Sequence, residues 1–182
     1  YLKNINDALL FSSQNGVESV VHHPKAAELK VKDVFCVGVK TKALLEANGF
    51  NVVAYTGYAE DLAEIITLVY PNKTYTFFSG NLRRDTLPEA LTEAGVIFNE
   101  ITVYQTVLTP QKIDTKPDGI LFFSPSGVQS FLKENELQDE VCFCIGSTTA
   151  KALRGITNKV VTANQPTIES TIAKSIEFFN KI

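Results

Sequence analysis

Short runs of apolar residues alternate with segments of helical periodicity along this chain of 182 residues. The apolar runs at residues 8–11, 35–37, 75–79 and 120–123 end in turns that contain Ser or Gly. Strands with few polar positions are typical of a parallel sheet that helices cover on both faces. The pattern therefore predicts an α/β fold of doubly wound parallel sheets.

Helices are expected after the strands, and three of them end at a glycine suited to the left-handed conformation of a C-cap. The three glycines are Gly49, Gly95 and Gly155. The predicted helices span residues 16–21, 41–48, 59–70, 82–94, 127–135, 148–154 and 167–180.

The chain contains two copies of one strand-and-helix pattern. Segment 7–17 resembles segment 118–128, since both are apolar strands that end in a Ser-containing turn. Segment 35–44 resembles segment 143–152, and in both a Gly is followed three residues later by a Thr. Two matching segments in the same order predict two related α/β domains.

We expect the first copy to form a complete domain over residues 1–97, inserted into the other domain. Residues 98–110, rich in β-forming side chains, are expected to connect the domains, and residues 111–182 to form the C-terminal part of the other domain. The second copy has no counterpart of the fourth strand and helix of the first. Its missing N-terminal strand is therefore expected before Tyr1. The chain also contains no methionine, which likewise indicates that residues precede Tyr1.

Composition argues against several classes of protein. No apolar run approaches the roughly 20 residues of a membrane span, and the first residues are too polar for a signal peptide, so a cytoplasmic protein without a membrane partner is expected. The net charge of −3 argues against binding to nucleic acid. Cys36, Cys142 and Cys144 lie in apolar runs without C-x-x-C spacing, which predicts buried thiols, no disulfide and no metal site.

Candidate ligand-binding groups lie in the turns that follow the strands. In an open parallel sheet, ligands bind beyond the carboxyl ends of the strands, where unpaired N–H groups at helix starts attract anions. These turns combine glycine with hydroxyl side chains, although the hydroxyls could also serve only as helix caps. The turns are residues 13–16, 38–41, 79–84, 124–127 and 146–149. They predict a ligand rich in carboxylates.

Two other side chains have open interpretations. Arg84, like Arg83, could bind a carboxylate of a ligand or pair with Asp85 or Glu89 of its own helix. Tyr104 could face a cleft between the domains or be buried as a sheet residue.

Taken in order, these segments resemble uroporphyrinogen-III synthases over essentially the whole chain. The matching motifs are residues 10–17, Val37-Gly38-x-x-Thr41, Ser79-Gly80 with Arg84-Asp85-x-Leu87, Val103-Tyr104-x-Thr106, residues 122–128, residues 145–150 and Gln165-Pro166-Thr167. The family's N-terminal strand and helix have no match here.

The resemblance implies two α/β domains joined by an extended two-stranded connector, with the active site in the cleft between them. It implies conversion of the linear tetrapyrrole hydroxymethylbilane to uroporphyrinogen III, with inversion of the last pyrrole ring and without metal or cofactor. It also implies a monomer that takes its small-molecule substrate by hand-over from hydroxymethylbilane synthase.

The resemblance also implies roles for particular residues. Tyr104 matches the tyrosine of the family and is expected to be catalytic, helping the terminal hydroxyl of the substrate to leave. The expected substrate-binding residues are Ser13, Gln14, Asn15, Thr41, Gly80, Arg84, Ser124, Pro125, Ser126, Gly127, Thr148 and Thr149.

Two other classes of function fit parts of the pattern. A two-lobed, non-enzymatic module that binds a small anionic ligand would explain the duplication, but not the whole ordered set of motifs. A flavodoxin-like electron carrier is less favoured, because no hydroxyl-rich phosphate loop surrounds a single switch point.

Overall fold

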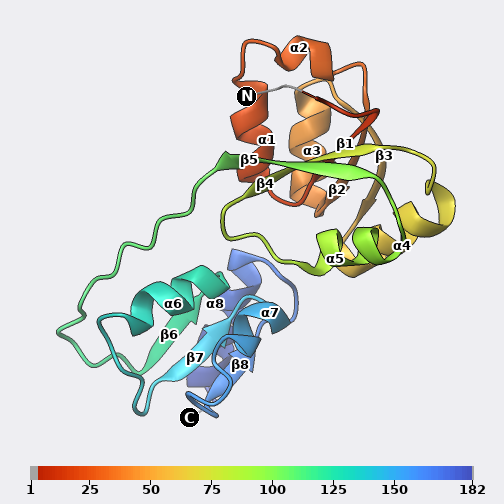
Figure 1. The fold of residues 1–182 in the computed structure, drawn as a ribbon. Helices are drawn as coiled ribbons and strands as arrows, with labels where there is room; N and C mark the ends of the chain where they lie inside the picture. Colours follow the sequence, from red (N-terminus) through yellow and green to blue (C-terminus); the bar gives the residue numbers. More distant parts are fainter. Residues whose placement is uncertain (1–3, 182) are drawn as a thin grey trace. The chain divides into compact units, whose positions relative to one another are not determined.

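The computed structural model describes residues 4–181, and the chain divides into two compact units with the boundary between Thr106 and Val107 (Figure 1). The first unit contains β1 (Ala8–Phe11), α1 (Gln14–Val21), α2 (Ala26–Leu29), β2 (Asp33–Val37), α3 (Val39–Ala47), β3 (Asn51–Thr56), α4 (Ala59–Val69), β4 (Tyr75–Gly80), α5 (Thr86–Glu93) and β5 (Phe98–Tyr104). The second unit contains β6 (Gly119–Phe122), α6 (Pro125–Leu132), β7 (Val141–Cys144), α7 (Ser147–Lys151), β8 (Val160–Thr162) and α8 (Ile168–Phe179).

The first unit is a five-stranded parallel sheet in the order β3-β2-β1-β4-β5, with a core on each face. Leu10 and Phe77 pack with buried side chains of α4 and α5. Leu9 and Phe78, their neighbours along the strands, pack with α1 and α3 on the other face. Each large apolar side chain buried in this way contributes about 1.5–3 kcal/mol. The predicted α/β class with parallel sheets is confirmed.

The second unit contains a three-stranded parallel sheet in the order β6-β7-β8. Phe122, Cys142 and Cys144 form a core with side chains of α6 and of the segment after α7. Phe143, buried on β7, contacts Phe178 and Phe179 of α8. The order β6-β7-β8 repeats the order β1-β2-β3 of the first unit, as expected if the two segments are copies of one pattern.

The end of β5 carries an irregularity that bears on the candidate site. Ser79 of β4 lies opposite Thr102, but the next residue, Gly80, lies opposite Tyr104. Val103 is therefore an extra residue on β5, as in a β-bulge. Bulges bend a strand and re-aim the side chains that follow.

The start of α5 corrects the predicted helix over residues 82–94. The helix begins at Thr86, with Asp85 at its N-cap. Pro88 explains the difference, because it lacks an N–H group and its ring clashes with the carbonyl of the residue four positions earlier, here Arg84. Both arginines therefore lie in a loop before the helix and not on its first turn.

The segment predicted to connect the domains has two parts. Residues 98–104 form β5, which pairs with β4 in the sheet of the first unit. Residues 105–118, all of them described, contain no helix or strand. The predicted caps Gly49, Gly95 and Gly155 are confirmed, since all three have positive φ angles.

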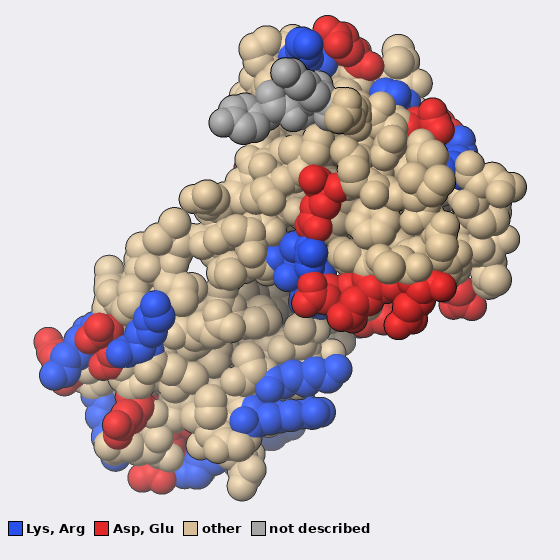
Figure 2. All heavy atoms as spheres, viewed as in Figure 1, with Lys and Arg blue, Asp and Glu red and all other residues tan. Residues whose placement is uncertain are grey.

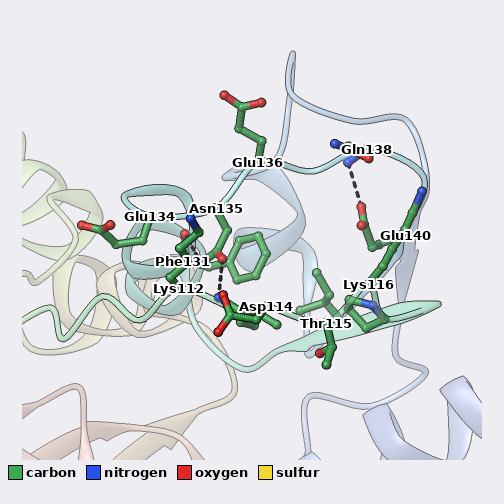
Figure 3. Close-up of a pocket in the computed structure, with 13 residues that line it drawn as sticks. Lys112, Asp114, Thr115, Lys116, Phe131, Glu134, Asn135, Glu136, Gln138 and Glu140 are labelled. Atoms are coloured by element: carbon green, nitrogen blue, oxygen red, sulfur yellow. Dashed lines mark hydrogen bonds between the residues drawn. The ribbon is translucent and has the colours of Figure 1, made fainter.

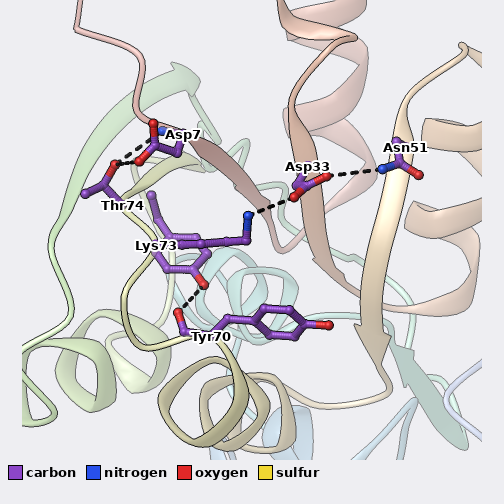
Figure 4. Close-up of polar contacts among 7 residues, drawn as sticks. Asp7, Asp33, Asn51, Tyr70, Lys73 and Thr74 are labelled. Carbon is purple, nitrogen blue, oxygen red and sulfur yellow. Dashed lines mark hydrogen bonds and ion pairs between the residues drawn. The ribbon is translucent and has the colours of Figure 1, made fainter.

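Polar contacts close the amino end of the first sheet (Figure 4). Lys73, before β4, forms an ion pair of 2.9 Å with Asp33 at the start of β2, and Asn51 of β3 donates to the same carboxylate. The Thr74 hydroxyl donates to Asp7, before β1. Two strands and the approaches to two others are thus tied together at the edge opposite the candidate site.

Acidic side chains gather over α4 and α5 (Figure 2). The exposed members of this acidic face are Glu60, Asp61, Glu64, Asp85, Glu89 and Glu93. An anionic ligand would be repelled there, so this face is a poor place for it. None of the helices in the described part of the chain is long and apolar enough to cross a membrane.

Candidate functional site

The strand order of the first unit defines a switch point between β1 and β4. The chain runs from β1 outward through β2 to β3, and then crosses to β4 and β5 on the other side of β1. Helices that follow the strands diverge at such a point and leave a crevice beyond the carboxyl ends. Ser13 lies in the turn after β1, and Gly80 is the last residue of β4; both were predicted as site residues.

Ser13 and Tyr104 meet at this edge, although 91 positions separate them in the sequence. Ser13 is the N-cap of α1, and its hydroxyl accepts a hydrogen bond of 3.2 Å from the N–H group of Gly16. The same hydroxyl donates to the phenolic oxygen of Tyr104 over 3.0 Å. A phenol that accepts from Ser13 keeps its own O–H proton available for donation to a ligand.

Gly80 accommodates the ring of Tyr104. A Cβ atom at Gly80 would lie 2.5 Å from Cε2 and 2.7 Å from the phenolic oxygen of that ring. Such distances are too short for any side chain, so glycine is required for the ring to lie in this place. The bulge at Val103 sets Tyr104 directly opposite Gly80. Ser13, Gly80 and Tyr104 therefore form one cluster, which we call the switch-point cluster.

The two arginines after β4 differ in their surroundings. The guanidinium of Arg83 donates from Nε to Glu100 over 2.5 Å and from a terminal nitrogen to the same carboxylate over 2.9 Å, and it also pairs with Asp85. Burial alone would raise the pKa of Glu100, but the hydrogen bonds and the positive charge of Arg83 outweigh it and lower the pKa. Arg83 is thus held by the protein.

Arg84 is exposed, and within residues 4–181 it makes no ion pair. Of the two arginines it is the one whose charge is free for a ligand. Gln14 and Asn15, also predicted as site residues, lie exposed in the first turn of α1 beside Ser13.

The turn after β2 contains Gly38 and Thr41. Gly38 is the N-cap of α3 and has a φ angle of 95°, a conformation that favours glycine. Thr41 is 4% exposed, so its hydroxyl faces the protein more than solvent. Lys42, the next residue, lies over the ring of Tyr55 at 4.4 Å from its centroid.

The second unit repeats this arrangement after β6. Ser124 is the N-cap of α6 and accepts a hydrogen bond of 3.0 Å from the N–H group of Gly127. Its hydroxyl also lies 3.0 Å from that of Ser126, and Pro125 occupies the first helical turn between them. The equivalence of Ser124 with Ser13 as helix caps follows the duplication of the two segments.

The turns after β7 and β8 provide further hydroxyl groups. Thr149 of α7 is 3% exposed and is thus nearly buried, like its counterpart Thr41 in the first unit. Thr148 is half-buried. Thr167 caps α8 and accepts a hydrogen bond of 3.1 Å from the N–H group of Ser170. The predicted residues of the second unit therefore lie at the carboxyl edge of its sheet.

A hollow of about 390 Å³ lies at the other end of the second sheet (Figure 3). Its lining mixes charges of both signs, from residues such as Lys112, Lys116 and Glu134. Glu140 accepts a hydrogen bond of 2.7 Å from the N–H group of Gln138, and backbone hydrogen bonds of this kind lower its pKa. Its lining has two lysines against four acidic residues, so the hollow has no excess of cations for a carboxylate-rich ligand.

The cysteines form no reactive site. All three are buried and free, as predicted. Burial raises the pKa of Cys36 to about 12, and that of Cys142 and Cys144 to about 11, so the thiolate form is scarce near neutral pH. Among the described residues, no three His, Cys, Asp or Glu side chains come together as a metal site would require.

Asn81 and Glu100 contribute to this edge but were not predicted. Asn81 hydrogen-bonds to the backbone of Thr106, and Glu100 holds Arg83. An Asn directly after a strand indicates a side chain that bonds to backbone. Its partner, 25 positions away, depends on the pairing of β4 with β5.

The chain is similar to known uroporphyrinogen-III synthases in sequence and in structure. The family model described as uroporphyrinogen-III synthase HemD matches residues 1–173. The chain belongs to the uroporphyrinogen-III synthase family. A uroporphyrinogen-III synthase from Chlorobaculum parvum is 30% identical, in a match that covers 84% of this chain and 71% of that protein. The resemblance inferred from the motifs is therefore confirmed.

Solved structures of the same family share the fold. The uroporphyrinogen-III synthetase of Helicobacter pylori superimposes with a TM-score of 0.77 at 23% identity, covering 98% of this chain and 88% of that chain. A mutant uroporphyrinogen-III synthase of Thermus thermophilus gives a TM-score of 0.64 at 16% identity, covering 98% and 80%. At these identities the likeness establishes the α/β fold.

Proposed function

We propose that this chain is a uroporphyrinogen-III synthase, which cyclises hydroxymethylbilane to uroporphyrinogen III with inversion of the last pyrrole ring. Membership of the family over residues 1–173 is the observation that carries this proposal. The switch-point cluster supports it, because a phenol with a free O–H proton lies where an open parallel sheet binds ligands.

Tyr104 is proposed to act at the first step, the departure of the terminal hydroxyl group of the substrate. Its phenol donates a hydrogen bond or a proton to that hydroxyl, which leaves as water. Ring closure then passes through a spirocyclic intermediate at the last pyrrole ring, which fragments and closes again in the inverted orientation. Ser13 keeps the phenol in place by donating to its oxygen.

The substrate carries eight carboxylates, and the two carboxyl edges are suited to bind them. The free N–H groups at the starts of α1 and α6 attract anions, beside the hydroxyls of Ser13, Ser124 and Ser126. Arg84 adds an unpaired positive charge in the first unit. The acidic face includes Glu60, Asp61 and Asp85 at the starts of α4 and α5 and repels carboxylates there, which favours binding beside the start of α1.

Thr41 and Thr149 are proposed to orient the backbone of their turns. Both side chains are nearly buried, which favours an internal role over direct contact with substrate. The main contribution of the protein is then positioning, because holding the last ring in a reactive geometry favours the spirocyclic route over simple closure to the I isomer.

The test is incubation of the protein with hydroxymethylbilane generated in place by hydroxymethylbilane synthase, followed by separation of the I and III isomers. Formation of the III isomer at a rate proportional to protein concentration is expected. Formation of the I isomer alone would refute the proposal and would favour a non-enzymatic anion-binding module.

The role of Tyr104 is tested by replacement with phenylalanine. Loss of a positioned proton donor should lower kcat by about 10²–10⁴-fold. Tyr58→Phe is the matched control, since the Tyr58 side chain is 59% exposed at the N-cap of α4. Equal kcat values for the two variants would remove Tyr104 from the chemistry.

The proposal includes a cytoplasmic monomer organised as two domains, which receives its substrate by hand-over from hydroxymethylbilane synthase. Sedimentation of the pure protein checks the oligomeric state. A coupled assay with an added competing sink for free hydroxymethylbilane checks the hand-over, because direct transfer would protect the substrate from the sink.

A further inference from the structure

Asn81 forms hydrogen bonds with the last residue of β5 and with the second residue after the strand. Its backbone N–H group donates to the carbonyl oxygen of Tyr104 over 3.3 Å. Its side-chain amide donates to the carbonyl oxygen of Thr106 over 3.2 Å and accepts from the N–H group of Thr106 over 2.7 Å. We call this set of three hydrogen bonds the Asn81 clasp.

The clasp lies at the carboxyl end of β5, where its pairing with β4 ends. Tyr104 is the last residue of β5, and residues 105–118, all within the described part, form no strand or helix. A strand end frays when its backbone groups have no partners. The Asn81 clasp provides partners for the residue that carries the phenol and for the second residue beyond it.

The clasp also lies beside Gly80 and the bulge at Val103, the two features that set the position of the Tyr104 ring. Gly80, against which the ring lies, is the residue directly before Asn81. The bulge at Val103 has already shifted the register of β5 by one residue. Because the strand pairing is irregular there, we infer that the hydrogen bonds of Asn81 fix the position of the end of β5, and with it the position of the phenol beside Ser13.

We propose that Asn81 is a positioning residue for the synthase reaction, which holds the phenol of Tyr104 at Ser13 through the end of β5. This inference rests on the proposed function. The side chain of Asn81 is exposed, so water can replace its hydrogen bonds at little cost to stability. The effect of the clasp should therefore fall on kcat and not on folding.

The experiment measures kcat and KM for Asn81→Ala, Tyr104→Phe and the double variant. Displacement of a reacting group by a fraction of an ångström should lower kcat of Asn81→Ala by about tenfold, with KM changed less than about twofold. If Asn81 acts through Tyr104, its replacement should have no further effect on kcat in the Tyr104→Phe background. Asn81→Asp keeps the acceptor for the N–H group of Thr106, so it should retain more activity than Asn81→Ala.

Asn135 provides a matched control. Its side chain donates to the carbonyl oxygen of Phe131 and accepts from the N–H group of Ile113 (Figure 3). It also donates to the carbonyl oxygen of Gln111, so the three hydrogen bonds form a similar clasp in the second unit. Asn135→Ala should leave kcat within about twofold of the unchanged protein. A loss of kcat equal to that of Asn81→Ala would show a general effect of losing such a clasp and would overturn the inference.

Amide hydrogen exchange separates this inference from the proposed function. Asn81→Ala should speed exchange at Thr106, whether or not the protein is a synthase. Unchanged exchange, unchanged kcat, or equal losses of kcat with and without the Tyr104 phenol would each overturn the positioning role. If the unaltered protein forms no III isomer, the proposed function fails, and the role of Asn81 in the reaction fails with it.

Discussion

Replacement of Gly80 by alanine would add a methyl group where the ring of Tyr104 lies. The added Cβ atom would lie 2.5 Å from Cε2 and 2.7 Å from the phenolic oxygen, whereas ordinary contact begins at 3.4 Å. The Cζ atom of the ring lies nearer still, so the ring must move by about 1 Å. Because these atoms are at the far end of a side chain, the ring can swing away, and the cost in stability should be at the low end of overpacking, about 1 kcal/mol.

The displacement should affect the reaction more than the fold. The phenol would leave its position 3.0 Å from the Ser13 hydroxyl. A misplacement of about 1 Å can lower kcat by about 10²-fold. We therefore expect Gly80→Ala to lose about two orders of magnitude in kcat for the III isomer, with a modest shift of the urea unfolding midpoint.

The assay compares initial rates of formation of the III isomer with urea unfolding of the same preparations. Gly57→Ala is the control, because a Cβ at Gly57 meets no described atom within 4 Å; it should change stability by less than about 0.5 kcal/mol. In a Tyr104→Ala background the ring is gone, so Gly80→Ala should add no further cost in stability. If Gly80→Ala behaves like Gly57→Ala in both rate and stability, the ring does not lie against Gly80 and the reasoning is refuted.

Two more predictions concern titration and thiol reactivity. Because the folded state lowers the pKa of Glu100, its ion pair stabilises the protein fully above the unfolded pKa of about 4.3, and this contribution is lost as the pH falls through the folded pKa. Urea midpoints between about pH 6 and pH 3 should therefore fall less steeply for Glu100→Gln, and parallel curves would contradict this. Cys36, Cys142 and Cys144 should resist a thiol reagent at about pH 8 in the folded protein and react rapidly in urea, whereas fast labelling without urea would contradict their burial.

Much of the fold could be predicted because it is encoded in short stretches of sequence. The apolar run that forms β1, the Ser13 cap and the glycine that ends α3 each depend on a few adjacent residues. Elements with weaker local signals were missed. The four-residue helix α2 has no side-chain cap, and Pro88 moved the start of α5 past the two arginines.

The candidate site was predicted in its parts but not in its arrangement. Ser13, Gly80 and Tyr104 were each named from the motifs, and the structure brings these three together. That Arg83 is held while Arg84 is free could not be predicted, because Glu100, the partner of Arg83, is 17 positions away on β5.

The sequence by itself determined the parallel α/β class, the duplicated strand order and the hydroxyl-bearing turns at helix starts, because periodicity and capping act over neighbouring residues. Only the tertiary structure decided that β5 pairs with β4, that the register shifts at Val103 and that Asn81 bonds to Thr106. These features depend on which distant strands lie side by side, and a shift of one residue re-aims a side chain without changing the local pattern. The position of the Tyr104 phenol is therefore a property of the assembled sheet.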